Sequence, residues 1–211
     1  MKVVSLNIGS STEIKSRGKL VKTGIKKVGT QDPVFVSTNG MEGDAVLNTK
    51  HHGGPDQAVY AYRIEDYEWW SEELGRQIKP TSFGENLTLE GILSPALRIG
   101  VQLVFDEIVL EVTAPRIPCQ TLNTVMGGDG FSKHFAKAAR SGFYFRVIKE
   151  GYLSTGESFV LEHPDVSWPT TVELFYANYR KLDNEELQKF IAAPIDIRTR
   201  VKLQHQLERL A

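Results

Sequence analysis

The chain has 211 residues, of which 41% are hydrophobic and 24% are charged, and its formal net charge is −1. This length suffices for one domain, or one domain with a small addition, and the near-neutral charge argues against a general nucleic-acid-binding protein. No apolar run approaches the ~18–20 residues that cross a bilayer, and the start of the chain is too briefly apolar for a secretory signal. A single cysteine, Cys119, also fits a reducing compartment, so we expect a cytoplasmic protein without a membrane span.

Short strands separated by turns account for most of the chain before residue 164. Runs of strand length, several rich in β-branched and aromatic residues, lie at 3–6, 24–28, 34–37, 102–105, 107–112 and 143–148. Glycine turns such as Asn39-Gly40 and Glu150-Gly151 separate them. This pattern predicts a mainly β fold of the α+β class, with a β-barrel rather than a wound parallel sheet.

Two helices are predicted within this β-rich part. The segment 63–74 places Ile64, Tyr67, Trp70 and Leu74 on one helical face, and Gly75 follows as a stop signal. The segment 131–140 places Phe131 and Phe135 on another face. We expect both helices to pack on the β core.

The composition changes after residue 163, where three short helical patterns follow one another. Thr170 or Thr171, Asp183 and Asp196 are suitable first residues for them. We therefore predict a β-barrel domain at 1–163 and a small three-helix subdomain at 164–211, which would owe its stability to packing on the barrel.

The first 30 residues carry seven Lys or Arg side chains against one Glu, a surplus of 7 − 1 = 6. Such a basic cluster either gathers anionic partners or forms a solvated face, and the sequence leaves both interpretations open.

Two segments combine glycine with polar side chains. In Lys50-His51-His52-Gly53-Gly54-Pro55-Asp56-Gln57, the glycines allow backbone amides to approach a ligand, and the Lys and His side chains supply positive charge. This pattern suits a phosphate-bearing ligand better than zinc, because adjacent side chains of an extended segment point to opposite sides. In Phe83-Gly84-Glu85-Asn86-Leu87, Asn86 is a candidate for binding a heterocycle, although asparagine is also common in turns.

The only thiol lies in the segment Pro115-Arg116-Ile117-Pro118-Cys119-Gln120-Thr121-Leu122-Asn123, directly after a predicted strand. The two prolines fix the backbone next to Cys119, and the guanidinium of Arg116 would favour its thiolate. The alternative is a small buried apolar residue, which the polar surroundings disfavour.

Taken in order, Gly40-Met41-Glu42-Gly43-Asp44, the histidine–glycine–proline block, Phe83–Leu87 and Pro115–Cys119 resemble the motifs of MOSC domains, named for the C-terminal domain of molybdenum cofactor sulfurase. The resemblance covers roughly residues 1–163 and is greatest to the stand-alone bacterial YiiM-type members, whose three-helix tail the remaining residues resemble.

The resemblance implies that Cys119 ligates molybdenum of the pyranopterin molybdenum cofactor, in an enzyme that reduces N-hydroxylated bases, amidoximes and related compounds. Soft sulfur ligands suit a redox-active metal. The cofactor or substrate would be held by side chains that carry charge or an amide: Lys50, His51, His52, Gln57, Asn86, Arg116 and Asn123. Because the chain lacks the motifs of an iron–sulfur or dinucleotide site, a separate electron-transfer reductase is expected as partner.

Two alternatives stay open at this point. Cys119 would instead accept persulfide sulfur from a pyridoxal-phosphate cysteine desulfurase and act as a sulfur carrier. The chain could also be a binding module that keeps the pocket without turnover. The oligomeric state and the physiological substrate are not defined by the sequence.

Overall fold

The computed structural model describes residues 1–47, 53–128, 130–164 and 166–210. Its strands are β1 (Lys2–Gly9), β2 (Thr12–Ser16), β3 (Lys19–Thr23), β4 (Lys27–Thr30), β5 (Val34–Ser37), β6 (Gly40–Met41), β7 (Val59–Arg63), β8 (Leu87–Glu90), β9 (Gln102–Val104), β10 (Val109–Pro115), β11 (Phe143–Lys149), β12 (Gly151–Leu153) and β13 (Val160–Glu162). Its helices are a short 3₁₀ turn η1 (Pro55–Gln57), α1 (Ile64–Glu73), α2 (Gln120–Met126), α3 (Phe131–Ala138), α4 (Thr171–Tyr176), α5 (Asn184–Ala192) and α6 (Ile197–Glu208).

Eight strands form the large sheet, in the order β13-β9-β10-β11-β7-β8-β1-β4. Its pairs are antiparallel except for β7 with β8, which run parallel, so the fold is a mixed α+β architecture. The two edge strands, β13 and β4, do not pair with each other among the described residues, so the predicted closed barrel is not confirmed. Two backbone hydrogen bonds, from Val3 N to Glu157 O and from Phe159 N to Met1 O, tie the chain before β13 to β1.

The prediction of a strand at residues 24–28 is wrong in its position. The structure has β4 at Lys27–Thr30 instead, while Gly24 has its Cα packed against the carbonyl of Ala45. A side chain at residue 24 would collide with that carbonyl oxygen at 1.9 Å, so this glycine marks a close approach of two loops.

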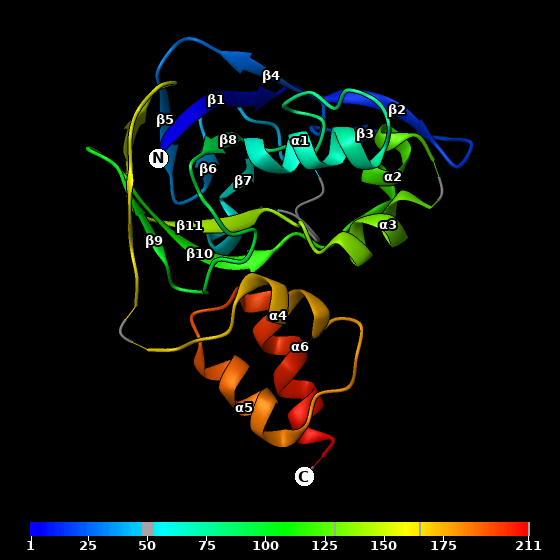
Figure 1. The fold of residues 1–211 in the computed structure, drawn as a ribbon, viewed down its shortest axis with the longest axis vertical. Coiled ribbons are helices and arrows are strands. Elements are labelled where there is room, and N and C mark those ends of the chain that lie inside the picture. The colour runs from blue at the N-terminus through cyan, green and yellow to red at the C-terminus, as the bar shows by residue number, and fades with distance from the viewer. Residues whose placement is uncertain (48–52, 129, 165, 211) are drawn as a thin grey trace.

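The predicted helices of the β-rich part are confirmed as α1 and α3 (Figure 1). Together with the sheet, these helices enclose a buried aromatic cluster. Trp70 of α1 and Phe135 of α3 stack with ring planes 8° apart, and both are fully buried. This second core lies beside the segment that carries Cys119, which contacts it.

Near the C-terminus, the residues predicted to begin helices do so. The side chains of Thr170, Asp183 and Asp196 accept hydrogen bonds from the backbone at Glu173, Glu186 and Thr199, which satisfies amides that have no partner within their own helix. Helices α4 to α6 lie together on one side of the sheet (Figure 1). Their apolar residues Leu174, Leu187, Phe190 and Leu203 belong to the same buried cluster as the sheet residues. The domain boundary at 163/164 stays a prediction.

Candidate functional site

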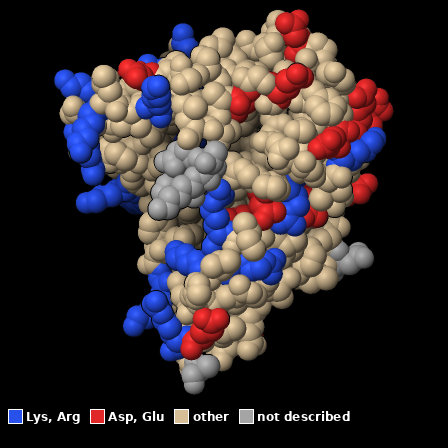
Figure 2. Space-filling view, turned by 180° about the vertical axis from the view of Figure 1, so that it is seen from behind, with Lys and Arg blue, Asp and Glu red and all other residues tan. Residues whose placement is uncertain are grey.

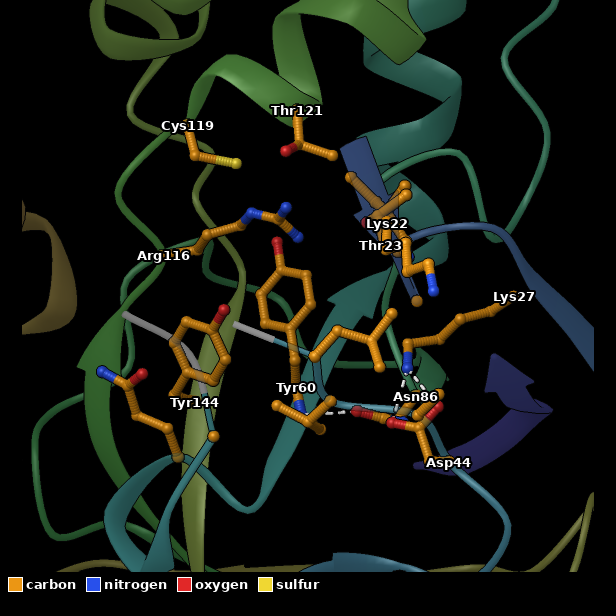
Figure 3. A pocket seen from close by; sticks show the side chains of 18 of the residues that line it. Lys22, Thr23, Lys27, Asp44, Tyr60, Asn86, Arg116, Cys119, Thr121 and Tyr144 are labelled. Atoms are coloured by element: carbon orange, nitrogen blue, oxygen red, sulfur yellow. Dashed lines mark hydrogen bonds and ion pairs between the residues drawn. The ribbon is translucent and has the colours of Figure 1, made fainter. Parts of the chain in front are cut away.

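A pocket lies between the β2–β3 hairpin, the start of helix α2 and the strands β7 and β11 (Figure 3). Its atom-free space is about 790 Å³, including the open mouth. Such a volume is typical of pockets that take cofactors or drug-sized molecules. The side chains that carry chemistry there are Lys22, Lys27, Asp44, Gln57, Tyr60, Asn86, Arg116, Cys119, Thr121 and Tyr144.

Cys119 lines this pocket and is half-buried. It is the residue that precedes α2, with an extended backbone (φ −116°, ψ 168°), and strand β10 ends four residues earlier at Pro115. Its sulfur points toward the guanidinium of Arg116 and the space in front of it (Figure 3). The sequence predicts that the thiol follows a strand and is not buried among aliphatic side chains. The position of Cys119 in the structure is consistent with both expectations.

Arg116 lies at the back of the pocket and is 5% exposed. Its Nη1 donates a hydrogen bond to the carbonyl oxygen of Phe83, and its guanidinium lies over the ring of Tyr60. Burial alone would lower the pKa of Arg116, but the oxygens of Tyr144 and Tyr60 and the sulfur of Cys119 outweigh it, so the net pKa is raised. The pocket therefore holds a permanent positive charge beside the thiol.

One atom of this guanidinium stands out. The Nε of Arg116 is buried and makes no hydrogen bond within the described part of the chain. A buried N–H group without an acceptor costs free energy. We therefore expect a bound ligand to supply an acceptor for this N–H group.

Two tyrosines complete this wall. Burial raises the pKa of Tyr60 and of Tyr144, partly against the attraction of Arg116, so both hydroxyls are protonated near neutral pH. The Tyr60 hydroxyl donates to the carbonyl oxygen of Ser141 at 2.8 Å. The Tyr144 hydroxyl instead points into the space shared with Arg116 and Cys119 (Figure 3).

On the opposite wall, Lys27 and Asp44 form a buried ion pair, with Nζ 2.6 Å from Oδ2. Asp44 also accepts from the backbone amide of Gly9 at 2.7 Å and from Nδ2 of Asn86 at 2.9 Å. Burial lowers the pKa of Lys27, and Asp44 opposes that shift. Together, these bonds fix the loop at residue 44 against strands β1 and β4 and against the residue that precedes β8.

Of the predicted binding residues, Arg116, Gln57 and Asn86 lie in the pocket together with Cys119. The amide of Asn86 is occupied by protein partners: Oδ1 accepts from Tyr60 N, and Nδ2 donates to Asp44 Oδ2 and to Asn7 O. Asn86 therefore holds the pocket together. A direct bond from its side chain to a ligand stays a prediction.

Gln57 bridges the pocket and the C-terminal helices. Its Oε1 accepts from Arg198 Nη1 at 3.2 Å, and its Nε2 donates to Asp196 Oδ1 at 3.4 Å. Gln57 and Tyr144 also line a second hollow, which lies next to helix α6.

Asn123 lies apart from the thiol. It is on helix α2, where its Oδ1 accepts from the backbone amide of Ser132 at 2.6 Å, and it lines a different hollow with Arg17 and Lys133. One helical turn separates Asn123 from Cys119 along the chain, but its side chain faces helix α3. The remaining three predicted residues, Lys50, His51 and His52, lie outside the described residues.

The prediction missed Tyr144, Tyr60, Lys27 and Asp44 as parts of the site. Tyr60 and Asp44 lie within or beside the glycine-containing motifs, so a signal was present for them. Tyr144 and Lys27 occur in strand segments where nothing in the local pattern distinguishes them from ordinary surface or core residues.

Within the described ranges, no group of three or more His, Cys, Asp or Glu side chains is arranged to hold a metal ion. A metal at Cys119 would therefore need further ligands from a cofactor or from outside these ranges. No helix in the part of the chain that the structure describes is long and apolar enough to cross a membrane.

The fold and this site define an α+β protein with a large mixed sheet and a thiol-bearing, positively charged pocket. Residues 48–160 match the family model of the MOSC domain, so the chain belongs to the MOSC domain family, which is associated with the molybdenum cofactor.

Relatives support this assignment. The chain is 37% identical to the protein YflK of Bacillus subtilis over 75% of its own length and 72% of YflK. It is 29% identical to the protein YiiM of Escherichia coli, over 62% of this chain and 59% of that protein. It is 30% identical to a protein of Gibberella moniliformis named a reductase, over 72% of this chain but only 28% of that protein.

Solved structures agree over the whole chain. YiiM from Geobacillus stearothermophilus superposes with a TM-score of 0.81 at 28% identity, covering 98% of both chains. YiiM from Escherichia coli superposes with a TM-score of 0.77 at 20% identity, covering 100% of this chain and 94% of that one, which shows the fold alone.

Proposed function

We propose that this protein binds the molybdenum cofactor through Cys119 and reduces N-hydroxylated compounds, such as N-hydroxylated bases and amidoximes. The observation that carries the proposal is the placement of the half-buried thiol beside the buried guanidinium of Arg116 in a pocket of cofactor size. Membership of the MOSC family and the reductase name of one relative support it. The similarity to YiiM from Geobacillus stearothermophilus over nearly the whole chain also supports assigning α4 to α6 as a YiiM-type tail.

The residues present fit a molybdenum pterin. The thiol is a soft ligand, and the ligands that it lacks among the described side chains would come from the sulfur atoms of the pterin. The orphaned Nε of Arg116 offers a charge-assisted hydrogen bond to an anionic or carbonyl oxygen of the guest. Lys22 adds a second positive charge at the mouth.

When bound, this cofactor supplies the two electrons that cleave the N–O bond, and the protein supplies orientation and charge. Reduction of R–NH–OH to R–NH2 and water consumes two electrons and two protons, of which solvent would supply one and would also return the proton to the side chain that donates the other. We propose that the Tyr144 hydroxyl donates one proton to the departing oxygen, because this phenol is protonated and points into the space beside Cys119 (Figure 3). Arg116 holds the positive charge that favours an anionic oxygen in the same space.

Metal and pterin analysis of protein made in a cofactor-competent host tests the proposal. We expect stoichiometric molybdenum and pterin in the wild type, and loss of both in Cys119→Ala. Cys119→Ser serves as the matched control, because a serine preserves the size and hydrogen bonding of the side chain while removing the soft ligand. Wild-type protein without molybdenum would refute the proposal.

A second candidate function rests on the same thiol. A half-exposed cysteine beside a fixed guanidinium also suits a persulfide carrier that is loaded by a pyridoxal-phosphate cysteine desulfurase. Mass spectrometry after incubation with a desulfurase and cysteine distinguishes the two. One added sulfur on wild-type protein, absent from Cys119→Ser, in protein that holds no molybdenum, would favour the carrier.

A further inference from the structure

The β2–β3 hairpin stands apart from the rest of the fold. It forms a two-stranded sheet of its own, with five paired positions from Thr12↔Thr23 to Ser16↔Lys19. It extends beyond helix α2 at the end of the molecule farthest from β9 (Figure 1). Ile14 and Ser16 are buried, and Ser16 Oγ lies 2.8 Å from Thr124 Oγ1 of α2. The hairpin is thus anchored on one face, and its other side has no cover among the described residues.

This hairpin is strongly basic. Lys15, Arg17, Lys19 and Lys22 of the hairpin, and Lys26 just after it, are all exposed, and Glu13 is the only acidic residue between positions 12 and 27. None of the four lysines forms an ion pair with a described acidic residue. Figure 2 shows Lys and Arg side chains gathered along one edge of the molecule, while more of the acidic side chains lie toward the other edge.

An apolar spot lies among these charges. Leu20 is 72% exposed and Val21 is 37% exposed, and the pairing of Lys15 with Leu20 sets charge directly beside apolar surface. A small apolar centre with a charged rim is the composition of a transient protein interface.

The hairpin is also a wall of the thiol pocket, because Val21, Lys22 and Thr23 line it (Figure 3). We propose that the β2–β3 hairpin is the docking surface for an acidic electron-donor protein, which delivers two electrons in successive one-electron steps to the site beside Cys119. This inference rests on the proposed reductase function. The charge selects an acidic partner, and the position at the mouth brings its redox centre close to the pocket.

A protein donor fits these observations better than a lipid surface or a nucleic acid. Each N–OH group reduced consumes two electrons, and a donor must approach the pocket mouth to supply them. Binding to an anionic membrane would need only the positive charge of the hairpin. It would not explain why this basic hairpin also forms a wall of the pocket.

The test compares two donors in turnover of an aromatic amidoxime by the molybdenum-loaded protein. Reduced methyl viologen is a small donor that needs no docking surface, whereas reduced plant-type ferredoxin and flavodoxin are acidic proteins. The variant is Lys15→Glu/Lys19→Glu, because neither residue lines the pocket. The matched control is Lys149→Glu/Lys181→Glu, which changes the net charge equally at exposed positions outside the hairpin.

We expect the hairpin variant to raise the KM for an acidic donor about tenfold at low ionic strength, with unchanged turnover by methyl viologen. The difference should shrink in high salt, because salt screens exposed charges. The control variant should behave like the wild type. Leu20→Ser should weaken docking by a smaller factor that salt does not remove, since it deletes apolar contact.

Equal KM values for the acidic donor in both double variants would overturn the inference, and so would turnover with methyl viologen but with neither acidic protein. A third contradicting result is a hairpin variant that no longer binds phosphatidylserine vesicles but keeps the wild-type KM for the donor. Failure of the proposed function has a separate signature, which is wild-type protein that reduces no amidoxime with any donor.

Discussion

The guanidinium carbon of Arg116 lies 4.9 Å from the centroid of the Tyr60 ring, so a buried cation rests on an aromatic face that belongs to strand β7. The same guanidinium donates to the carbonyl oxygen of Phe83, which precedes strand β8. Arg116 therefore links three segments of the pocket before any ligand arrives.

Arg116→Met should destabilise the cofactor-free chain by about 2 kcal/mol, because it removes the cation–π contact and leaves the Phe83 carbonyl without its donor. Urea unfolding measures the change. Arg209→Met, at an exposed position, should change the free energy of unfolding by less than about 0.5 kcal/mol. Equal losses in the two variants would show that the linkage contributes nothing.

Alkylation of Cys119 by iodoacetamide at pH 7 should be about tenfold slower in Arg116→Met than in the wild type, because the guanidinium stabilises the reactive thiolate. The rates should become equal in denaturant, where the two groups separate. A native rate that is unaffected by the substitution would contradict the electrostatic account of the pocket.

Glu85 gives a pH dependence with a defined sign. It is fully buried; burial raises its pKa above 4.5, and hydrogen bonds from Tyr67, Thr81 and Thr88 oppose that change. Between 4.5 and its raised pKa the folded chain binds more protons than the unfolded chain, so this carboxyl lowers the free energy of unfolding as the pH rises through that window. A pKa that differs by one between the folded and unfolded chains changes the free energy of unfolding by about 1.4 kcal/mol.

The measurement is the free energy of unfolding of the wild type and of Glu85→Gln at pH 5 and pH 7. The wild type should gain stability relative to the variant on going from pH 7 to pH 5. A difference that is constant with pH, or one that changes in the opposite direction, would show that the carboxyl is not under this burial penalty.

Tyr144→Phe should lower kcat for amidoxime reduction by about 100-fold with little change in molybdenum content, because it removes a proton donor and leaves the ring in place. The solvent isotope effect on kcat should change as well, which a purely structural role would not cause. Tyr152→Phe is the control, since Tyr152 is exposed on β12. Unchanged kcat in Tyr144→Phe would remove this residue from the chemistry.

Asn123→Ala should cost about 1 kcal/mol of stability, because Asn123 Oδ1 accepts the backbone amide of Ser132 near the start of α3. Molybdenum content should stay at the wild-type level, since the side chain faces a different hollow. Loss of metal without loss of stability would return Asn123 to the set of cofactor-binding residues.

Helix prediction worked where apolar residues recur at helical spacing and a capping residue or a glycine marks an end. This holds for α1 and α3 and for the capped starts of α4, α5 and α6. Strand prediction was weaker. All five residues of β7 are buried, and all but the last of β3 are exposed, so neither strand shows the alternation that reveals one buried face. The large sheet was predicted as a closed barrel, but closure depends on which edge strands meet, and no local pattern encodes that.

The motifs with proline, glycine and cysteine led to the pocket because such residues restrict the backbone around a functional group. Tyr144 lies in β11 between Phe143 and Phe145, where an aromatic residue is expected for packing. Only the tertiary arrangement turns its hydroxyl toward the thiol. Asn123 lies four residues from Cys119 in the chain, yet the turn of α2 carries its side chain elsewhere.

The pair of hydroxyls at Ser16 and Thr124 joins the basic hairpin to the helix that begins right after Cys119. The position of the hairpin relative to the sulfur therefore depends on a single hydrogen bond between side chains of β2 and α2. Ser16→Ala or Thr124→Val would remove this hydrogen bond without changing the lysines of the hairpin or Cys119, so the anchoring of the hairpin and its surface charge can be altered separately.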